Sequence, residues 1–154
     1  MESLRPSSRL VLATAMARPD DFSQCLVLNT VAAARTVLRR YDARLKPFGV
    51  TVQQFSLLAA IRYHPGETVG ALAQRVHLDR TSLTRNLSLL ERKGLVRRLP
   101  AGGNARPCEL TAAGAGLLDQ LLPEWRRAQS ELMTNVPEDD AATYLRIAQR
   151  LSKD

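Results

Sequence analysis

Hydrophobic residues return every three or four positions along most of the chain, which is the period of an amphipathic α-helix. Residues 22–45 contain neither glycine nor proline and predict one long helix that ends before Pro47. A second helix begins after Thr51, where Gln54 completes the sequence pattern of a capping box, and ends at the His-Pro-Gly sequence of residues 64–66. The chain therefore opens with two consecutive predicted helices.

Two further helices, joined by a tight turn, are predicted in the middle of the chain. Thr68 is placed to cap a short helix. Asp79 is placed to cap a longer one, which runs to Lys93 and ends at Gly94, a residue that tolerates a left-handed backbone. Two helices so closely spaced form a helix-turn-helix.

A β-hairpin is predicted directly after this helix-turn-helix. The stretches 95–99 and 107–110 flank residues 100–104, where two adjacent glycines supply the positive φ angles that a hairpin turn needs. A single hairpin in this place is a wing.

Long helices follow the wing. Thr111 is placed to cap a helix over residues 112–134, and Pro123 inside it is expected to kink or interrupt it, because proline lacks a backbone donor. Pro137 opens a final helix that reaches about Leu151. The predicted fold is mainly α with a small β-hairpin wing: a winged helix-turn-helix with long dimerisation helices at both ends of the chain.

The distribution of charge along the chain indicates a kind of binding partner. The chain carries a net charge of +7, and residues 72–106 hold eight basic residues against two acidic ones, a balance of +6. Such a concentration favours a polyanion, double-stranded DNA, over a winged-helix module that binds protein.

The second helix of the helix-turn-helix carries side chains suited to reading bases. Ser82, Arg85 and Asn86 recur at helical spacing on its N-terminal half, the part that meets base edges in helix-turn-helix proteins. Arginine grips guanine with two donors, asparagine pairs with adenine, and a hydroxyl serves phosphates or bases. The same helix adds Arg80, Thr81 and Thr84 as candidates, and the wing adds Arg97, Arg98 and Arg106 as minor-groove or phosphate contacts.

The last helix predicts self-association. Tyr144, Ile147, Ala148 and Leu151 share one apolar face, and long helices with such stripes at both chain ends need a partner to cover them. Two-fold symmetry would set the two helix-turn-helix units about 34 Å apart, which is one turn of DNA.

The order of these elements resembles the MarR family of bacterial winged-helix regulators. The resemblance runs from about residue 22 to 151 and rests on the stretches LKPFGVTVQQFSLLAAI (45–61), TVGALAQRVHLDRTSLTRNLSLLERKGLVRR (68–98) and ELTAAGAGLL (109–118). It implies a homodimer with intertwined terminal helices that reads a palindromic operator, usually as a repressor relieved by a small molecule or an oxidant.

The resulting division of the chain is an expectation. Residues 1–20 form a flexible arm, and residues 21–154 form one MarR-like domain. Within it, residues 46–111 are the DNA-binding lobe, and residues 21–45 and 112–154 are the dimerisation helices.

The wing departs from the family pattern. Asn104 stands where the family usually has an acidic residue two positions before its key arginine, and the hairpin is about two residues short. Arg106 is expected to keep the minor-groove role without an orienting carboxylate.

An effector is expected by resemblance, between the dimer helices and the DNA-binding lobe. Asn29, Arg35, Phe55 and Tyr63 are the candidate lining residues, although Phe55 and Tyr63 also fit apolar stripes as core residues. An arginine there could hold an aromatic carboxylate with two hydrogen bonds.

An alternative is a peroxide or redox sensor that acts through Cys25, which lies near the place of the reactive cysteine in peroxide-sensing family members. Asp20 and Asp21 nearby do not favour a thiolate. His64, His77 and two distant cysteines lack metal-ligand spacing, so no metal is expected. The sequence has no Gly-rich phosphate loop, nucleophile elbow or carboxylate pair on a shared face, so neither a cofactor nor catalysis is expected. No membrane-spanning run is present, and a cytoplasmic location is expected.

Overall fold

The computed structural model describes residues 22–100 and 107–153. The predicted arm of residues 1–20 and the wing residue Arg106 lie outside these ranges. The chain divides into two compact units, one ending at Arg39 and the other beginning at Arg40. No helix in the described ranges combines the length and apolar content needed to cross a membrane.

The first unit holds a short 3-10 helix, η1 (Phe22–Gln24), and most of helix α2 (Leu26–Leu45). The amide of Asn29 joins the two, donating hydrogen bonds to the carbonyl oxygens of Ser23 at 2.8 Å and Cys25 at 2.9 Å. The helix predicted over residues 22–45 therefore begins with a tighter turn.

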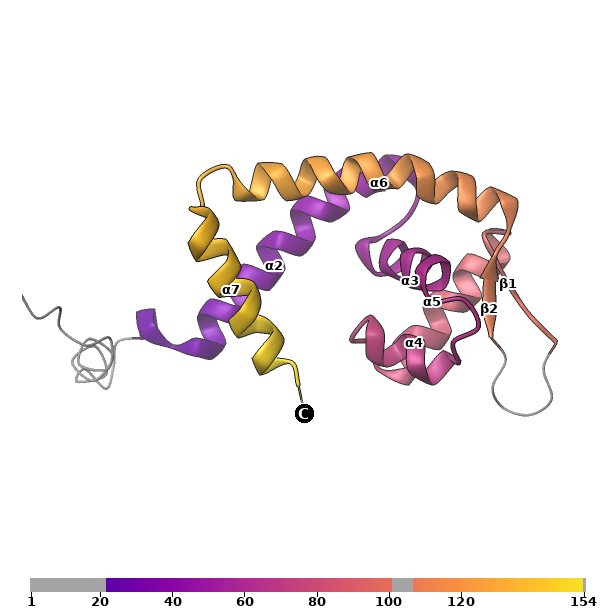
Figure 1. Ribbon diagram of the computed structural model, residues 1–154, viewed down its shortest axis with the longest axis horizontal. Coiled ribbons are helices and arrows are strands. Elements are labelled where there is room, and N and C mark those ends of the chain that lie inside the picture. Colours follow the sequence, from indigo (N-terminus) through magenta and orange to yellow (C-terminus); the bar gives the residue numbers. More distant parts are fainter. Residues whose placement is uncertain (1–21, 101–106, 154) are drawn as a thin grey trace, which may run out of the picture. The chain divides into compact units, whose positions relative to one another are not determined.

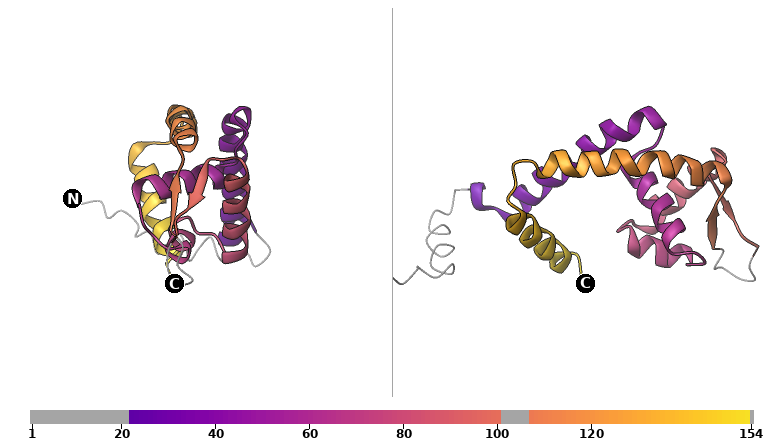
Figure 2. Two further views of the ribbon diagram at one scale, coloured as in Figure 1. Left: turned by 90° about the vertical axis from the view of Figure 1, so that its right-hand side faces the viewer. Right: turned by 45° about the horizontal axis from the view of Figure 1, so that its top comes forward.

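The second unit contains the winged helix-turn-helix. Helices α3, α4 and α5 pack together, and the antiparallel hairpin lies beside α5, with Val96 opposite Leu110 and Arg98 opposite Cys108 (Figures 1 and 2). The predicted fold class, mainly α with a small wing, is confirmed. The elements are η2 (Lys46–Phe48), α3 (Val52–Tyr63), α4 (Val69–Arg75), α5 (Arg80–Arg92), β1 (Val96–Arg98), β2 (Cys108–Leu110), α6 (Ala112–Met133) and α7 (Glu138–Leu151).

All four predicted helix caps are present. A side-chain oxygen of each accepts a hydrogen bond from the backbone N–H three residues later, and each such cap contributes about 1 kcal/mol. Gln54 also closes its capping box, and Gly94 has the left-handed φ of 69° that ends α5. The caps are Thr51, Thr68, Asp79 and Thr111.

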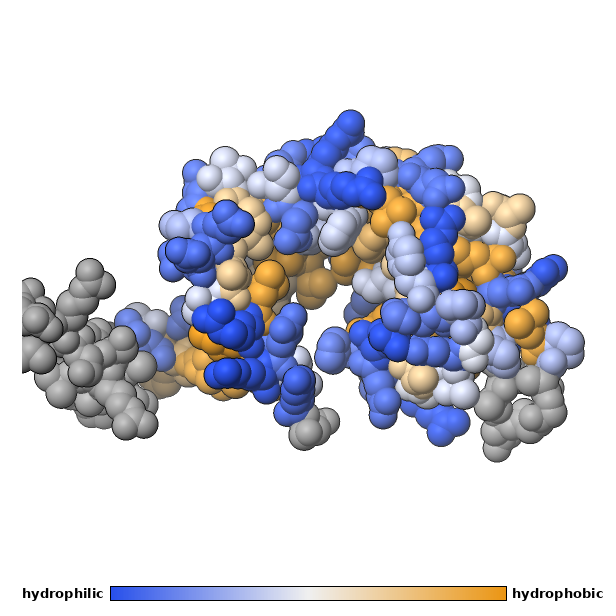
Figure 3. Space-filling view, viewed as in Figure 1, coloured by the Kyte–Doolittle hydropathy of each residue, from blue (hydrophilic) through white to orange (hydrophobic). Residues whose placement is uncertain are grey.

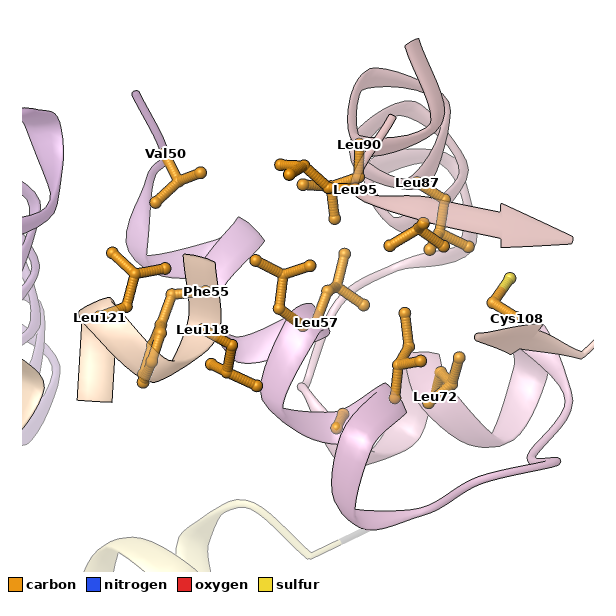
Figure 4. Packing of buried hydrophobic residues seen from close by; sticks show 14 of the residues in the cluster. Val50, Phe55, Leu57, Leu72, Leu87, Leu90, Leu95, Cys108, Leu118 and Leu121 are labelled. Atoms are coloured by element: carbon orange, nitrogen blue, oxygen red, sulfur yellow. The ribbon is translucent and has the colours of Figure 1, made fainter. Parts of the chain in front are cut away.

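Helix α3 is the centre of the core (Figure 4). Its neighbouring residues Leu57 and Leu58 are both fully buried, although successive side chains on a helix point about 100° apart. Helix α3 must therefore be covered over a wide arc, and α4, α5, α6 and β2 all contact it.

Helix α6 passes through Pro123 without interruption, so of the two predicted effects of this proline, a kink or a break, the break does not occur. Leu118 and Leu121 before the proline and Ala128 after it are all buried. Packing on both sides outweighs the lost backbone hydrogen bond, because tertiary contacts routinely override local propensity.

The wing and α6 meet at Gly114, which is buried in the first turn of that helix. A Cβ atom at this position would lie 1.9 Å from the backbone carbonyl oxygen of Leu95. Only a glycine allows the helix to approach Leu95, the residue before β1, so closely.

Gly114→Ala should therefore destabilise the protein by about 3 kcal/mol or more, because a backbone segment must shift to admit the methyl group. Gly116→Ala is the matched control: nothing lies within 4 Å of its added Cβ, and alanine favours the helix by up to about 1 kcal/mol. Urea denaturation followed by circular dichroism measures both. A shift of both midpoints in the same direction would contradict the close approach at Gly114.

Candidate nucleic-acid interface

The turn between α4 and α5 is fixed by its backbone. Val76 donates to the carbonyl oxygen of Leu72 at 3.0 Å, and Leu78 donates to that of Ala73 at 3.0 Å. Between them His77 adopts a left-handed φ of 52°, which is uncommon for a residue with a side chain. Helix α5 thus leaves α4 at a defined place, in the helix-turn-helix arrangement.

The start of α5 is held by Asp79. One carboxylate oxygen accepts from the backbone N–H of Ser82 at 2.8 Å, and the other accepts from the Ser82 hydroxyl at 2.6 Å. These hydrogen bonds to the charged form lower the pKa of Asp79 below its ordinary value. Ser82, a predicted DNA contact, is half-buried and already donates its hydroxyl proton within the cap.

Asn86 does not lie on the exposed face of α5 with Arg85, where its predicted role in reading bases would require it. It is 5% exposed, and its amide donates to the carbonyl oxygen of Ser82 at 2.9 Å and to Oε1 of Gln53 at 3.4 Å. A buried amide must find such partners inside the protein. The signal was present in the sequence, because position 86 continues the row of leucines at the spacing three, one, three: Leu83, Asn86, Leu87 and Leu90.

The solvent-facing side of α5 is instead formed by Thr81, Thr84 and Arg85, all exposed, with half-buried Ser88 one turn further. The last three of these positions lie three, four and seven residues after Thr81, so all four form one stripe along the helix. Ser88 is a further candidate contact, which the sequence-based prediction over residues 80–86 did not include. The Thr84 hydroxyl donates to the carbonyl oxygen of Arg80 at 2.8 Å.

The arginines of α5 are available to a partner. Within residues 22–100 and 107–153, no side chain forms an ion pair or hydrogen bond with the guanidinium groups of Arg80, Arg85 and Arg92. Their positive charge is therefore not neutralised by any described side chain. In the space-filling view, which is coloured by hydropathy, the surface over neighbouring α4 is largely hydrophilic (Figure 3).

The two wing arginines on β1 differ in their surroundings. Arg97 is exposed and pairs with Glu109, its cross-strand partner on β2. Arg98 is less exposed, and its Nε donates to a carboxylate oxygen of Glu91 on α5 at 2.9 Å. The sequence alone does not distinguish the two arginines, because the carboxylate that each one meets is set by the fold.

Two of the predicted effector residues, Phe55 and Tyr63, line a pocket of about 550 Å³ between α3, α4 and α6. Phe55 is buried and stacks on Trp125 with ring centroids 6.5 Å apart, whereas Tyr63 is 59% exposed. The arginine and histidine residues that line it are His64, Arg75, His77 and Arg126. Arg75 also forms two hydrogen bonds with Glu67 and holds the pKa of that carboxyl below its ordinary value.

The other two predicted effector residues belong to the first unit. Asn29 uses its amide locally, as described above, and Arg35 is exposed on α2. Whether either residue contacts an effector stays a prediction.

The two cysteines are both free thiols. Cys25 is half-buried directly before α2, and its assignment as a peroxide sensor stays a hypothesis. Cys108 on β2 is 3% exposed, and burial raises the pKa of its thiol, as expected of a structural residue.

The chain is similar in sequence to known regulators. A family model described as "MarR family" matches residues 48–107. The regulator PecS of Dickeya dadantii is 26% identical over 140 residues, which cover 84% of this chain and 81% of PecS. An uncharacterized HTH-type transcriptional regulator of Bacillus cereus is 30% identical over 101 residues, covering 66% of this chain and 68% of the relative.

Two similar solved structures contain DNA. The M. tuberculosis regulator MosR in complex with DNA is 37% identical with a TM-score of 0.75, covering 84% of this chain and 94% of that one. A cysteine-to-serine mutant of E. coli MarR with operator DNA is 27% identical with a TM-score of 0.75, covering 86% and 98%. The chain therefore belongs to the MarR family of winged-helix transcriptional regulators, which bind DNA.

Proposed function

We propose that the protein is a homodimeric repressor in the bacterial cytoplasm that reads a palindromic operator and releases it when a small anionic organic ligand binds. The observation that carries the proposal is the exposed stripe of α5, where Arg85 has no partner within the described residues and lies beside the hydroxyls of Thr81 and Thr84. A guanidinium donor and neighbouring hydroxyl groups on the N-terminal half of such a helix suit base edges in the major groove.

Uncovered apolar faces support the homodimer. No residue of α7 is buried, and Tyr144, Ile147 and Leu151 are each about half exposed on one side of it. In the first unit, Phe22, Leu26 and Val27 are more than 60% exposed. Clustered apolar surface of this kind is typical of an interface, because burying it stabilises the associated state.

The pocket between α3, α4 and α6 supports the ligand. Its aromatic wall of Phe55, Tyr63 and Trp125 suits a flat apolar body, and Arg126 suits a carboxylate, whereas Arg75 is already paired with Glu67. Arg75, Val76 and His77 join the pocket to the helix-turn-helix turn. An occupant of the pocket would therefore touch the segment that positions α5.

Arg85→Ala should weaken binding to a duplex selected from a random pool by about 1–3 kcal/mol, and it should relax specificity at one base position. Binding to a random-sequence duplex should fall much less, because that binding depends on phosphates. Fluorescence anisotropy with both duplexes measures the difference.

Arg127→Ala on α6 is the matched control for that experiment, since it removes the same charge from an exposed residue paired with Glu124. Equal losses for Arg85→Ala on the selected and random duplexes would show that Arg85 contacts phosphate and does not read a base.

Ile147→Lys should shift the protein from dimer to monomer, because it places a charge in the middle of the apolar face of α7. Gln149→Lys adds the same charge on the opposite face and should leave the dimer intact. Sedimentation velocity at micromolar concentration distinguishes the two states. A dimer unaffected by Ile147→Lys would remove α7 from the interface.

Tyr63→Ala should raise the concentration of benzoate or a ring-substituted benzoate needed for half-release of the selected duplex by about tenfold, since one aromatic contact is lost. DNA affinity without the ligand should stay unchanged, because Tyr63 is largely exposed. Release at an unchanged concentration would place the ligand elsewhere.

A further inference from the structure

Two adjacent arginines on β1 are paired with carboxylates in different settings. Arg97 is 69% exposed and pairs across the hairpin with Glu109, which is 36% exposed. Arg98 is 31% exposed and pairs with Glu91, which is 28% exposed. The first pair is a surface pair, whereas the second is two-thirds removed from solvent.

The Arg98 pair joins two elements of the interface. Glu91 lies in the last turn of α5, and Arg98 is the last residue of β1, so the ion pair spans the turn that connects them. Within that turn, Gly94 donates to the carbonyl oxygen of Glu91 at 2.9 Å and Leu95 donates to that of Leu90 at 3.0 Å. The ion pair adds a third connection between α5 and the segment that follows it, at the last residue of β1.

Arg98 lies next to a buried residue. Cys108, which lies opposite Arg98 in the hairpin, is 3% exposed. If Arg98 turned away to a phosphate, the Glu91 carboxylate would remain partly desolvated without its partner, which is unfavourable. Arg97 can leave Glu109 at little cost, because exposed ion pairs contribute little.

We infer that Arg98 and Glu91 are positioning residues for DNA binding, which fix the direction of the wing relative to α5, and that Arg97 alone of the two arginines contacts phosphate. This inference replaces the sequence-based expectation that Arg97 and Arg98 act alike. It depends on the DNA-binding activity of the family and not on the proposed repressor role or ligand.

The test compares the two carboxylates. Removing the charge of a carboxylate that merely competes for a DNA-contacting arginine strengthens DNA binding, whereas removing one that positions the wing weakens it. Glu91→Gln and Glu109→Gln are thus a matched pair with opposite expected signs. Each variant is measured by anisotropy on a duplex selected from a random pool, over a series of salt concentrations, and its folding is checked by urea denaturation.

Glu91→Gln and Arg98→Gln should each weaken binding to the selected duplex by about tenfold, the scale of one charge-assisted hydrogen bond, without changing the salt dependence. Glu109→Gln should strengthen binding. Arg97→Gln should weaken it and reduce the slope of log K against log salt by about 1.

A charge swap keeps the inference testable if a single variant unfolds. Glu91→Arg combined with Arg98→Glu rebuilds the ion pair in reverse and should restore binding to within about threefold of the original protein. The inference is overturned if Glu91→Gln strengthens binding, if Arg98→Gln lowers the salt slope as Arg97→Gln does, or if the folded charge-swap variant remains as weak as Arg98→Gln.

Discussion

The burial of one row of α5 against α3 determines what the rest of α5 can do. Leu83, Leu87 and Leu90 are fully excluded from solvent, and a helix side chain cannot move to another face without turning the whole helix. With that row held in the core, Arg85 has to face outward, whereas Asn86 has to face inward and take its hydrogen bonds from within the protein. The side of the helix offered to DNA is thus set by hydrophobic packing.

Electrostatics then depends on how the acids of this segment are used. Asp79 and Glu91 are the two acidic residues within residues 72–106, and both are engaged internally. Asp79 caps the first turn of α5, and Glu91 pairs with Arg98 in front of the wing. Neither carboxylate is left to oppose a phosphate backbone. The outward-facing arginines of α5 therefore present their charge without local compensation.

Features that depend on a few neighbouring residues could be predicted from the sequence. The caps at Thr51, Thr68, Asp79 and Thr111 are confirmed because a cap needs only its own side chain and a backbone donor three residues later.

Features decided by distant parts of the chain could not be predicted in this way. The continuity of α6 through Pro123 depends on packing partners elsewhere, and so do the carboxylate that Arg98 meets and the stacking of Phe55 on Trp125. The inward orientation of Asn86 is a different case, since its spacing within the leucine row carried the information.

Selection of bound duplexes from a random pool by the full-length protein tests the central claim, that a dimer reads sequence through α5. We expect enrichment of an inverted repeat whose half-sites are centred about one helical turn, or 10 base pairs, apart. The claim would be contradicted if no sequence were enriched, or if only a single unrepeated half-site were.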